Sequence, residues 1–92
     1  MITLTDIEEA RARFEGNVTE TPLVWSQSFS RLSGRAVYLK AECMQRAGSF
    51  KIRGALNVLT RLEGKPVVAA AAGNHAQGVA LASAFTGSPC TI

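Results

Sequence analysis

The chain has 92 residues, 47% of them apolar, and a formal net charge of +3. This length allows one small domain rather than two. Its acidic and basic residues are interspersed, without the clustered positive charge of nucleic-acid binding proteins, so composition and charge argue against a nucleic-acid partner.

The N-terminal third is expected to be helical in two places. Thr5 is a natural N-cap, and Glu8 three residues later completes a capping box for a helix that ends at Phe14. Residues 26–33 form a second, short helical segment, and Gly34 suits the left-handed position after it. The charged N-terminus lacks a long apolar run, which predicts neither a signal peptide nor a membrane span.

From residue 36 onward, strands and helices alternate. Residues 36–42 are typical of a strand, and the apolar residues of 49–62 recur at the three- and four-residue spacing of a helix. Residues 66–71 form a short apolar run, residues 74–85 a second helix, and residues 89–92 begin another apolar run. This order predicts an α/β fold, a parallel sheet with flanking helices in three αβα layers.

The sheet predicted in this way is incomplete. Its last strand has only just begun at Ile92. We therefore expect residues 1–92 to be the front part of a longer protein.

Cysteine and histidine usage points away from disulfide and metal chemistry. Cys43 and Cys90 are far apart and form no CxxC pair, so we expect two buried thiols in a reducing cytosol. His75 is the only histidine, and we expect a hydrogen-bonded loop residue rather than a metal ligand. Lys40 and Glu42, at the end of the first strand of the alternating series, are expected to form a solvated ion pair.

Lys51 occupies an unusual position for a lysine. It follows Ser49, a potential cap, and lies in the first turn of the predicted helix between Phe50 and Ile52. A cation there meets the positive end of the helix dipole, which costs about 0.3–1 kcal/mol. The same field and the apolar neighbours favour the neutral amine, which can attack a carbonyl and form a Schiff base. A solvated surface lysine is the simpler alternative.

The stretch AAAAGNHAQGVA is a second candidate site. It follows an apolar strand and opens a helix, the position at which parallel sheets bind ligands. Gly73 lets backbone N–H groups approach an anion, and Asn74 and His75 add side-chain donors. The pattern is neither a Walker loop nor a dinucleotide fingerprint. It indicates a carboxylate or phosphate site, with an ordinary turn capped by asparagine as the alternative.

Together the two stretches carry a resemblance. LKAECMQRAGSFKIRGALN followed by AAGNHAQGVALA strongly resembles the threonine dehydratase family, which includes serine dehydratases and serine racemases. That family lies within the tryptophan synthase β-like (fold type II) pyridoxal-phosphate enzymes. The match runs from TPL at residues 21–23 to PCTI at the end. The resemblance implies that residues 1–92 are the N-terminal portion of a lyase catalytic domain, an incomplete part of a fold type II enzyme.

The resemblance also implies a cofactor and the residues that bind it. Pyridoxal 5′-phosphate would be held through a Schiff base to Lys51, which would also carry the Cα proton of the substrate. Phe50 would lie against the cofactor ring, and Asn74 would hydrogen-bond the phenolic oxygen. The family's glycine-rich phosphate loop would lie downstream of Ile92.

For the substrate, the resemblance implies a small amino acid. Its carboxylate would be held by Ala72, Gly73, Asn74 and His75, which agrees with the anion site inferred from the residues themselves. The implied reaction is β-elimination, which converts threonine into 2-oxobutanoate, or serine into pyruvate, with release of ammonia. The choice between the two amino acids stays open. A homo-oligomer in the cytoplasm, with no membrane partner, is expected.

Two alanines depart from the family pattern. Ala71 and Ala72 stand where Ser-Ala or Ser-Ser usually precedes Gly-Asn-His. Ala72 lacks the hydroxyl that a racemase would use as a second acid or base, which favours a dehydratase. Ala71 removes a hydroxyl near the substrate carboxylate, a loss of about 1.5–3 kcal/mol in binding. A serine racemase-like enzyme and a truncated, non-catalytic remnant are the alternatives.

Overall fold

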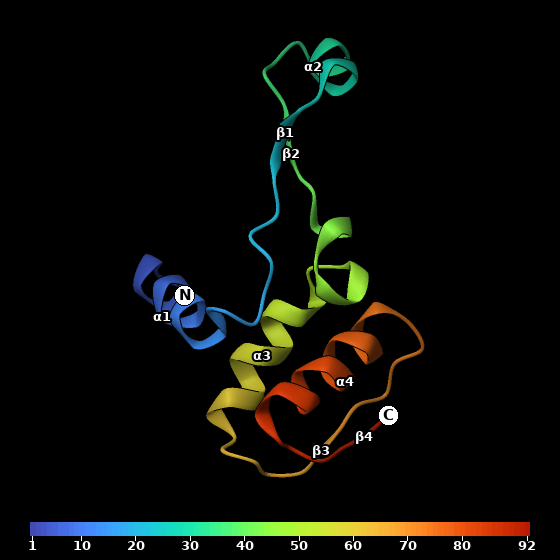
Figure 1. The fold of residues 1–92 in the computed structure, drawn as a ribbon. Coiled ribbons are helices and arrows are strands. Elements are labelled where there is room, and N and C mark those ends of the chain that lie inside the picture. The colour runs from blue at the N-terminus through green and yellow to red at the C-terminus, as the bar shows by residue number, and fades with distance from the viewer.

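A computed structural model describes all 92 residues, which form an elongated molecule of 47 × 31 × 25 Å. Figure 1 shows a helical base, which comprises residues 4–14 and 42–91, and an arm of residues 23–40 that projects from it. The helices and strands, in chain order, are α1 (Leu4–Phe14), β1 (Leu23–Trp25), α2 (Gln27–Ser33), β2 (Tyr38–Lys40), α3 (Lys51–Arg61), β3 (Val67–Val68), α4 (Asn74–Thr86) and β4 (Cys90–Thr91). Two short 3-10 turns, η1 (Glu42–Met44) and η2 (Arg46–Gly48), connect β2 to α3. No helix has both the length and the apolar character that a membrane crossing requires.

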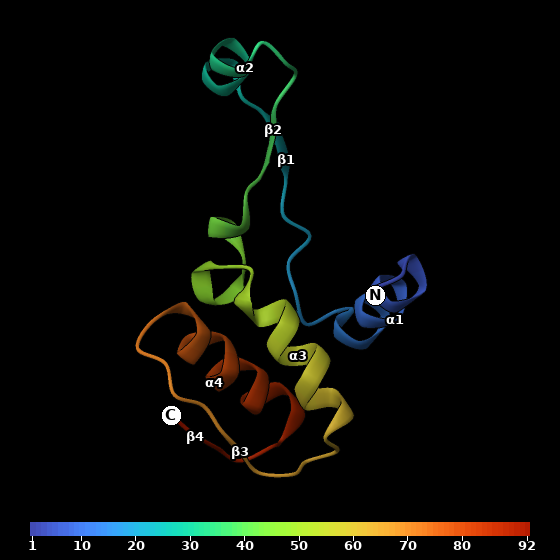
Figure 2. The same ribbon diagram turned by 180° about the vertical axis from the view of Figure 1, so that it is seen from behind.

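The core lies between α3 and α4, which run side by side in both views (Figures 1 and 2). Ile52 and Leu56 are fully buried, and the helical spacing predicted for this segment is confirmed. The other buried apolar residues are Ala55, Leu59, Val79 and Ala82. The contact with α4 therefore helps to position α3.

The α/β class predicted from the sequence is confirmed. Strands β3 and β4 pair in parallel, with Val67 opposite Cys90 and Val68 opposite Thr91. Helix α4 connects them, so β3, α4 and β4 form one crossover unit. The chain leaves β3, passes through residues 69–73 and enters α4, which places the GNH stretch at the start of a helix as predicted.

The expectation that residues 36–42 join this parallel sheet is wrong. Strand β2 covers only Tyr38–Lys40 and pairs antiparallel with β1, with Leu23 opposite Lys40. Gly34 adopts the left-handed conformation at the end of α2, with φ of 67°, and the chain returns along the arm. The apolar pattern predicted a strand correctly, but the partner of a strand depends on chain reversal elsewhere and is not encoded in the strand itself.

The N-cap of α1 lies two residues before the predicted one. Thr3, rather than Thr5, accepts a hydrogen bond from the amide of Asp6 at 3.2 Å, and the Asp6 carboxylate accepts one from the Thr3 amide at 2.7 Å. Both TLTD and TDIE fit the capping-box pattern. The pattern therefore identifies the type of cap but leaves two registers open.

The register of this cap can be checked by two matched substitutions. Thr3→Ala is expected to lower the free energy of unfolding by about 0.5–1 kcal/mol, because it leaves a helix N–H group without its partner. Thr5→Ala is expected to leave it nearly unchanged, since Thr5 lies inside α1 and is exposed. Urea unfolding of both variants measures the difference, and an equal or larger loss for Thr5→Ala would contradict the assignment.

The cysteine prediction is also wrong in part. Cys43 is exposed in η1, and Cys90 in β4 is partly buried. Both are free thiols.

Candidate active site

Lys51 is the first residue of α3, as the sequence predicts. Phe50 occupies the N-cap position, and the Ser49 hydroxyl accepts a hydrogen bond from the Lys51 amide at 3.3 Å. Ser49 is buried, so its hydroxyl is held in place. The predicted helix start is therefore confirmed, with Ser49 supporting the first turn from one residue before the N-cap.

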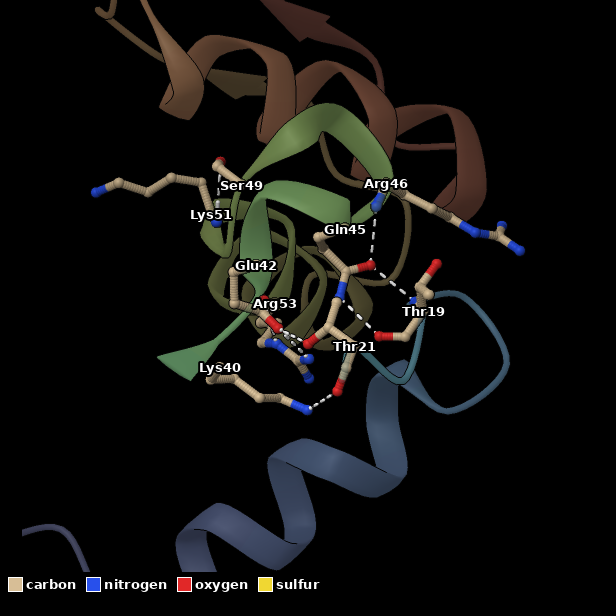
Figure 3. Close-up of polar contacts among 9 residues, drawn as sticks. All are labelled: Thr19, Thr21, Lys40, Glu42, Gln45, Arg46, Ser49, Lys51 and Arg53. Atoms are coloured by element: carbon tan, nitrogen blue, oxygen red, sulfur yellow. Dashed lines mark hydrogen bonds and ion pairs between the residues drawn. The ribbon is translucent and has the colours of Figure 1, made fainter. Parts of the chain in front are cut away.

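The side chain of Lys51 is exposed and has no carboxylate partner. Its Nζ atom lies 5.3 Å from the centre of the Phe50 ring, and both ion pairs of the chain join other residues. Figure 3 shows the Lys51 side chain directed away from the neighbouring polar cluster. An amine in this position is free to react with an electrophile.

The start of α4 is open to a ligand as well. Gly73 occupies the N-cap position, and no side chain caps the helix there. Asn74 and His75 are the first two helical residues, and both are exposed, as are Gly73 and Ala72 before them. The first N–H groups of an uncapped helix have no intrahelical acceptor, and the helix dipole adds partial positive charge to them. His75 has no hydrogen bond from its side chain in the structure, so the expected hydrogen-bonded histidine is not found.

Helices α3 and α4 begin at the same end of the base. The backbone of Lys51 lies against Gly78, and Leu59 and Phe85 line a common hollow further along the pair. The two helices therefore run in the same direction, which Figures 1 and 2 also show. Because Asn74 precedes Gly78 by four residues, α4 begins about 6 Å beyond the level of Lys51. The structure thus brings the two sequence motifs to one end of the helix pair.

Arg53, in the first turn of α3, forms an ion pair with Glu42. Its Nε and Nη2 atoms each donate a hydrogen bond of 2.8 Å to the carboxylate, and the Thr21 hydroxyl donates another. These donors, Arg53 first, lower the pKa of Glu42 from 4.5 to about 2. The expected Lys40–Glu42 pair is not formed, because Lys40 donates to the Thr21 carbonyl oxygen at 2.5 Å instead.

Gln45 fixes the loop that leads to Lys51. Its buried amide donates to the Thr19 carbonyl oxygen at 2.8 Å and accepts from the Thr19 amide at 2.7 Å. The Gln45 side-chain oxygen also accepts a hydrogen bond from the Arg46 amide at 2.9 Å (Figure 3). Residues 42–48 are thereby tied to an extended segment that lies 26 residues earlier in the chain.

Comparison with known proteins identifies the family of this chain. The model of the family described as pyridoxal-phosphate dependent enzyme matches residues 14–92. The chain belongs to the pyridoxal-phosphate dependent enzyme family. An L-threonine ammonia-lyase from Thermotoga maritima is 50% identical over 100% of this chain and 24% of its own length. A catabolic L-threonine dehydratase from Escherichia coli K12 is 47% identical over 94% of this chain and 27% of its own.

Solved structures show the same relationship. A T.th. threonine deaminase superimposes with a TM-score of 0.84 and 41% identity, over 98% of this chain and 33% of its own. A serine racemase from Dictyostelium discoideum superimposes with a TM-score of 0.88 and 38% identity, over 97% of this chain and 31% of its own. The chain spans about a quarter of the length of the curated relatives it matches. It is therefore similar to one part of these enzymes.

The residues present fit the cofactor of this family. Pyridoxal phosphate has an aldehyde, a flat aromatic ring and an anionic phosphate, and it binds to enzymes through a lysine. Lys51 offers an unpaired amine, and the exposed Phe50 ring lies beside it. Asn74 adds an exposed amide at the same end of the helix pair. No cluster of three or more metal-binding side chains occurs in the structure.

The sequence predicted the exposed residues of this candidate site but not the hydrogen bonds and the ion pair that hold them in place. Lys51, Phe50, Asn74 and the residues around Gly73 were predicted, and their roles toward cofactor and substrate stay predictions. The bond from Gln45 to Thr19 was not predicted, because it joins segments distant in sequence. The ion pair of Arg53 was not predicted either. Its only signal in the sequence was the place of Arg53 within the motif that carries the resemblance, two residues after Lys51.

Proposed function

We propose that the protein containing this chain is a pyridoxal-phosphate dependent ammonia-lyase that converts L-threonine or L-serine into a 2-oxo acid and ammonia. The observation that carries the proposal is the position of Lys51. Its unpaired amine lies at the same end of the α3–α4 pair as the uncapped start of α4. The sequence similarity to enzymes named L-threonine ammonia-lyase supports elimination over other reactions of the family.

In this proposal the start of α4 binds the substrate carboxylate. The N–H groups of Asn74 and His75 are donors, and the positive end of the helix dipole stabilises the anion. Gly73, without a side chain, keeps the approach open. Binding the carboxylate here orients the amino acid relative to Lys51.

Lys51, Phe50 and Asn74 serve the cofactor. The amine of Lys51 is the attachment point, the Phe50 ring offers an apolar surface that excludes water, and the Asn74 amide supplies a hydrogen-bond donor. When bound, pyridoxal phosphate supplies the electron sink that stabilises the negative charge at the substrate Cα.

The amine of Lys51 also moves the proton. Once the substrate amine has taken its place, the neutral Nζ atom accepts the Cα proton as a general base. The β-hydroxyl group would then leave as water, with a proton that balances the one taken from Cα. Hydrolysis of the resulting enamine takes up one water, so the net products from threonine are 2-oxobutanoate and ammonia.

Ala72 favours elimination over racemisation. A racemase needs a second acid or base to return a proton to the opposite face of Cα. The methyl group of Ala72 has no proton to give. The protein is therefore expected to release an oxo acid far faster than a D-amino acid.

Product analysis of the full-length protein tests this function. We expect the purified protein, supplied with pyridoxal phosphate and L-threonine or L-serine, to form 2-oxo acid and ammonia in equal amounts. Oxo acid is measured with a coupled dehydrogenase, ammonia by a separate assay, and D-amino acid by chiral chromatography.

Three outcomes separate the alternatives. Equal amounts of oxo acid and ammonia support the lyase. D-amino acid formed faster than oxo acid identifies a racemase instead. Absence of both products, in a folded protein that binds pyridoxal phosphate, contradicts the proposal and supports a non-catalytic remnant.

A further inference from the structure

Gly78 marks the place where α4 approaches α3 most closely. A Cβ atom added at Gly78 would lie 3.0 Å from the carbonyl carbon of Lys51 and 3.1 Å from the amide nitrogen of Ile52. Both are backbone atoms, which cannot rotate away as a side chain can. None of the other seven glycines would bring a Cβ within 4 Å of any such neighbour. Gly78 is therefore the one glycine at which the packing leaves little room for a side chain.

A glycine inside a helix lowers helix stability. Gly78 is the fifth residue of α4, and an alanine there would favour the helix by about 1 kcal/mol. Glycine at this position thus gives up local stability for the close approach to Lys51. Gly54 in α3 has the same intrinsic cost but faces open space in this structure.

The contact at Gly78 sets the distance between the two halves of the candidate site. Lys51 is fixed on one side by its own helix and touched on the other by Gly78. The uncapped start of α4 lies one turn before Gly78 on the same rigid helix. A shift of α4 away from α3 would therefore move the Asn74 and His75 amides away from the Lys51 amine.

We propose that Gly78 is a positioning residue that holds the anion-binding start of α4 and the amine of Lys51 at the separation that one amino-acid substrate requires. Gly78 touches no substrate and acts through the backbone of Lys51. The inference rests on the proposed function, because it assigns to these two groups a shared substrate.

The test compares Gly78→Ala with Gly54→Ala in the full-length protein. Each adds one methyl group to a helical glycine, but only the first meets backbone atoms. Two quantities are measured at a temperature where both variants are folded. The first is the pyridoxal phosphate concentration needed to label Lys51 after borohydride reduction, read by peptide mass spectrometry. The second is the KM for the amino acid.

Gly78→Ala is expected to raise the KM about threefold to tenfold, because relief of the contact moves the helices by a few tenths of an ångström, less than the displacement of about 1 Å that costs about a hundredfold. We expect labelling of Lys51 in this variant to need about threefold more pyridoxal phosphate. Gly54→Ala should leave both quantities unchanged. A Gly78→Ala protein that melts at a lower temperature but keeps the wild-type KM and labelling would show a merely structural role and overturn the proposal.

A second variant guards against failure to fold. Ala82 is fully buried one turn further along α4, so Ala82→Val also pushes the helices apart, but farther from Lys51. It should raise the KM by a smaller factor than Gly78→Ala. If Gly78→Ala does not fold, an unchanged KM in folded Ala82→Val overturns the proposal.

The labelling experiment separates this inference from the proposed function. A wild-type protein that is not labelled at Lys51 refutes the proposed function. A wild-type protein labelled at Lys51, together with wild-type behaviour of Gly78→Ala, refutes only the role of Gly78.

Discussion

Replacing Lys51 with alanine is expected to abolish oxo acid formation by the full-length protein while leaving its unfolding temperature nearly unchanged. The loss of rate should be about 10³-fold or more, because one side chain supplies both the attachment point and the proton acceptor. Stability should persist because the side chain is exposed and its amine forms no hydrogen bond or ion pair. The assay is oxo acid release, with thermal unfolding measured on the same preparation.

Two further variants make this result specific. Lys51→Arg keeps the positive charge, but a guanidinium stays protonated and forms no Schiff base, so this variant should be as inactive as Lys51→Ala. Lys65→Ala removes another exposed lysine, in the turn after α3, and should keep full activity. Borohydride reduction should place the cofactor on the peptide that contains residue 51. An adduct on Lys65 or Lys40 would contradict the assignment.

Local patterns predicted the elements that form the candidate site. The apolar spacing that begins at Ile52 identified α3, and the apolar run before Gly73 identified the strand-to-helix turn. Lys51 was identified as a candidate because a cation at a helix N-terminus interacts unfavourably with the helix dipole. Each of these signals lies within a few neighbouring residues, which is why a single sequence could carry them.

What the sequence could not predict depends on contacts between distant segments. The antiparallel partner of β2 is β1, on the other side of α2. Gln45 binds Thr19 across 26 residues, and Gly78 in α4 meets Lys51 in α3 although β3 lies between them in the chain. Ala47 adopts a left-handed conformation, with φ of 62°, that its residue type does not favour. The strand pairing, the Gln45–Thr19 bonds and the Gly78–Lys51 contact each depend on a partner that local patterns do not identify.

Loss of the Glu42–Arg53 ion pair is expected to have the second large effect. This pair fastens the first turn of α3 to the loop before it and, through Thr21, to the N-terminal segment. Glu42→Gln keeps the shape of the side chain but removes its charge. Because the side chains of Arg53 and Glu42 are only 29% and 16% exposed, breaking this pair is expected to lower the free energy of unfolding more than breaking an exposed surface pair.

The pKa of Glu42 gives the sign and size of this effect. Arg53 holds the pKa in the folded protein at about 2, below the ordinary 4.5, so folding favours the ionised form. The pair therefore contributes its full stability above about pH 4.5 and loses it as the pH falls toward 2. A difference of this size corresponds to about 3 kcal/mol, which partial solvent access reduces to about 1–2 kcal/mol.

Urea unfolding of wild type and Glu42→Gln at about pH 7 and about pH 2.5 measures this contribution. At pH 7 the variant should be less stable by about 1–2 kcal/mol. Near about pH 2.5 the difference should shrink, because the Glu42 carboxyl is then protonated in the unfolded chain, so proton binding favours unfolding of the wild type. Glu9→Gln is the matched control. Its carboxylate forms an exposed ion pair with Arg13 one turn along α1, so the change should stay below about 0.5 kcal/mol. A Glu42→Gln protein whose stability differs from wild type by the same amount at both pH values would show that the charge of Glu42 does not hold the start of α3.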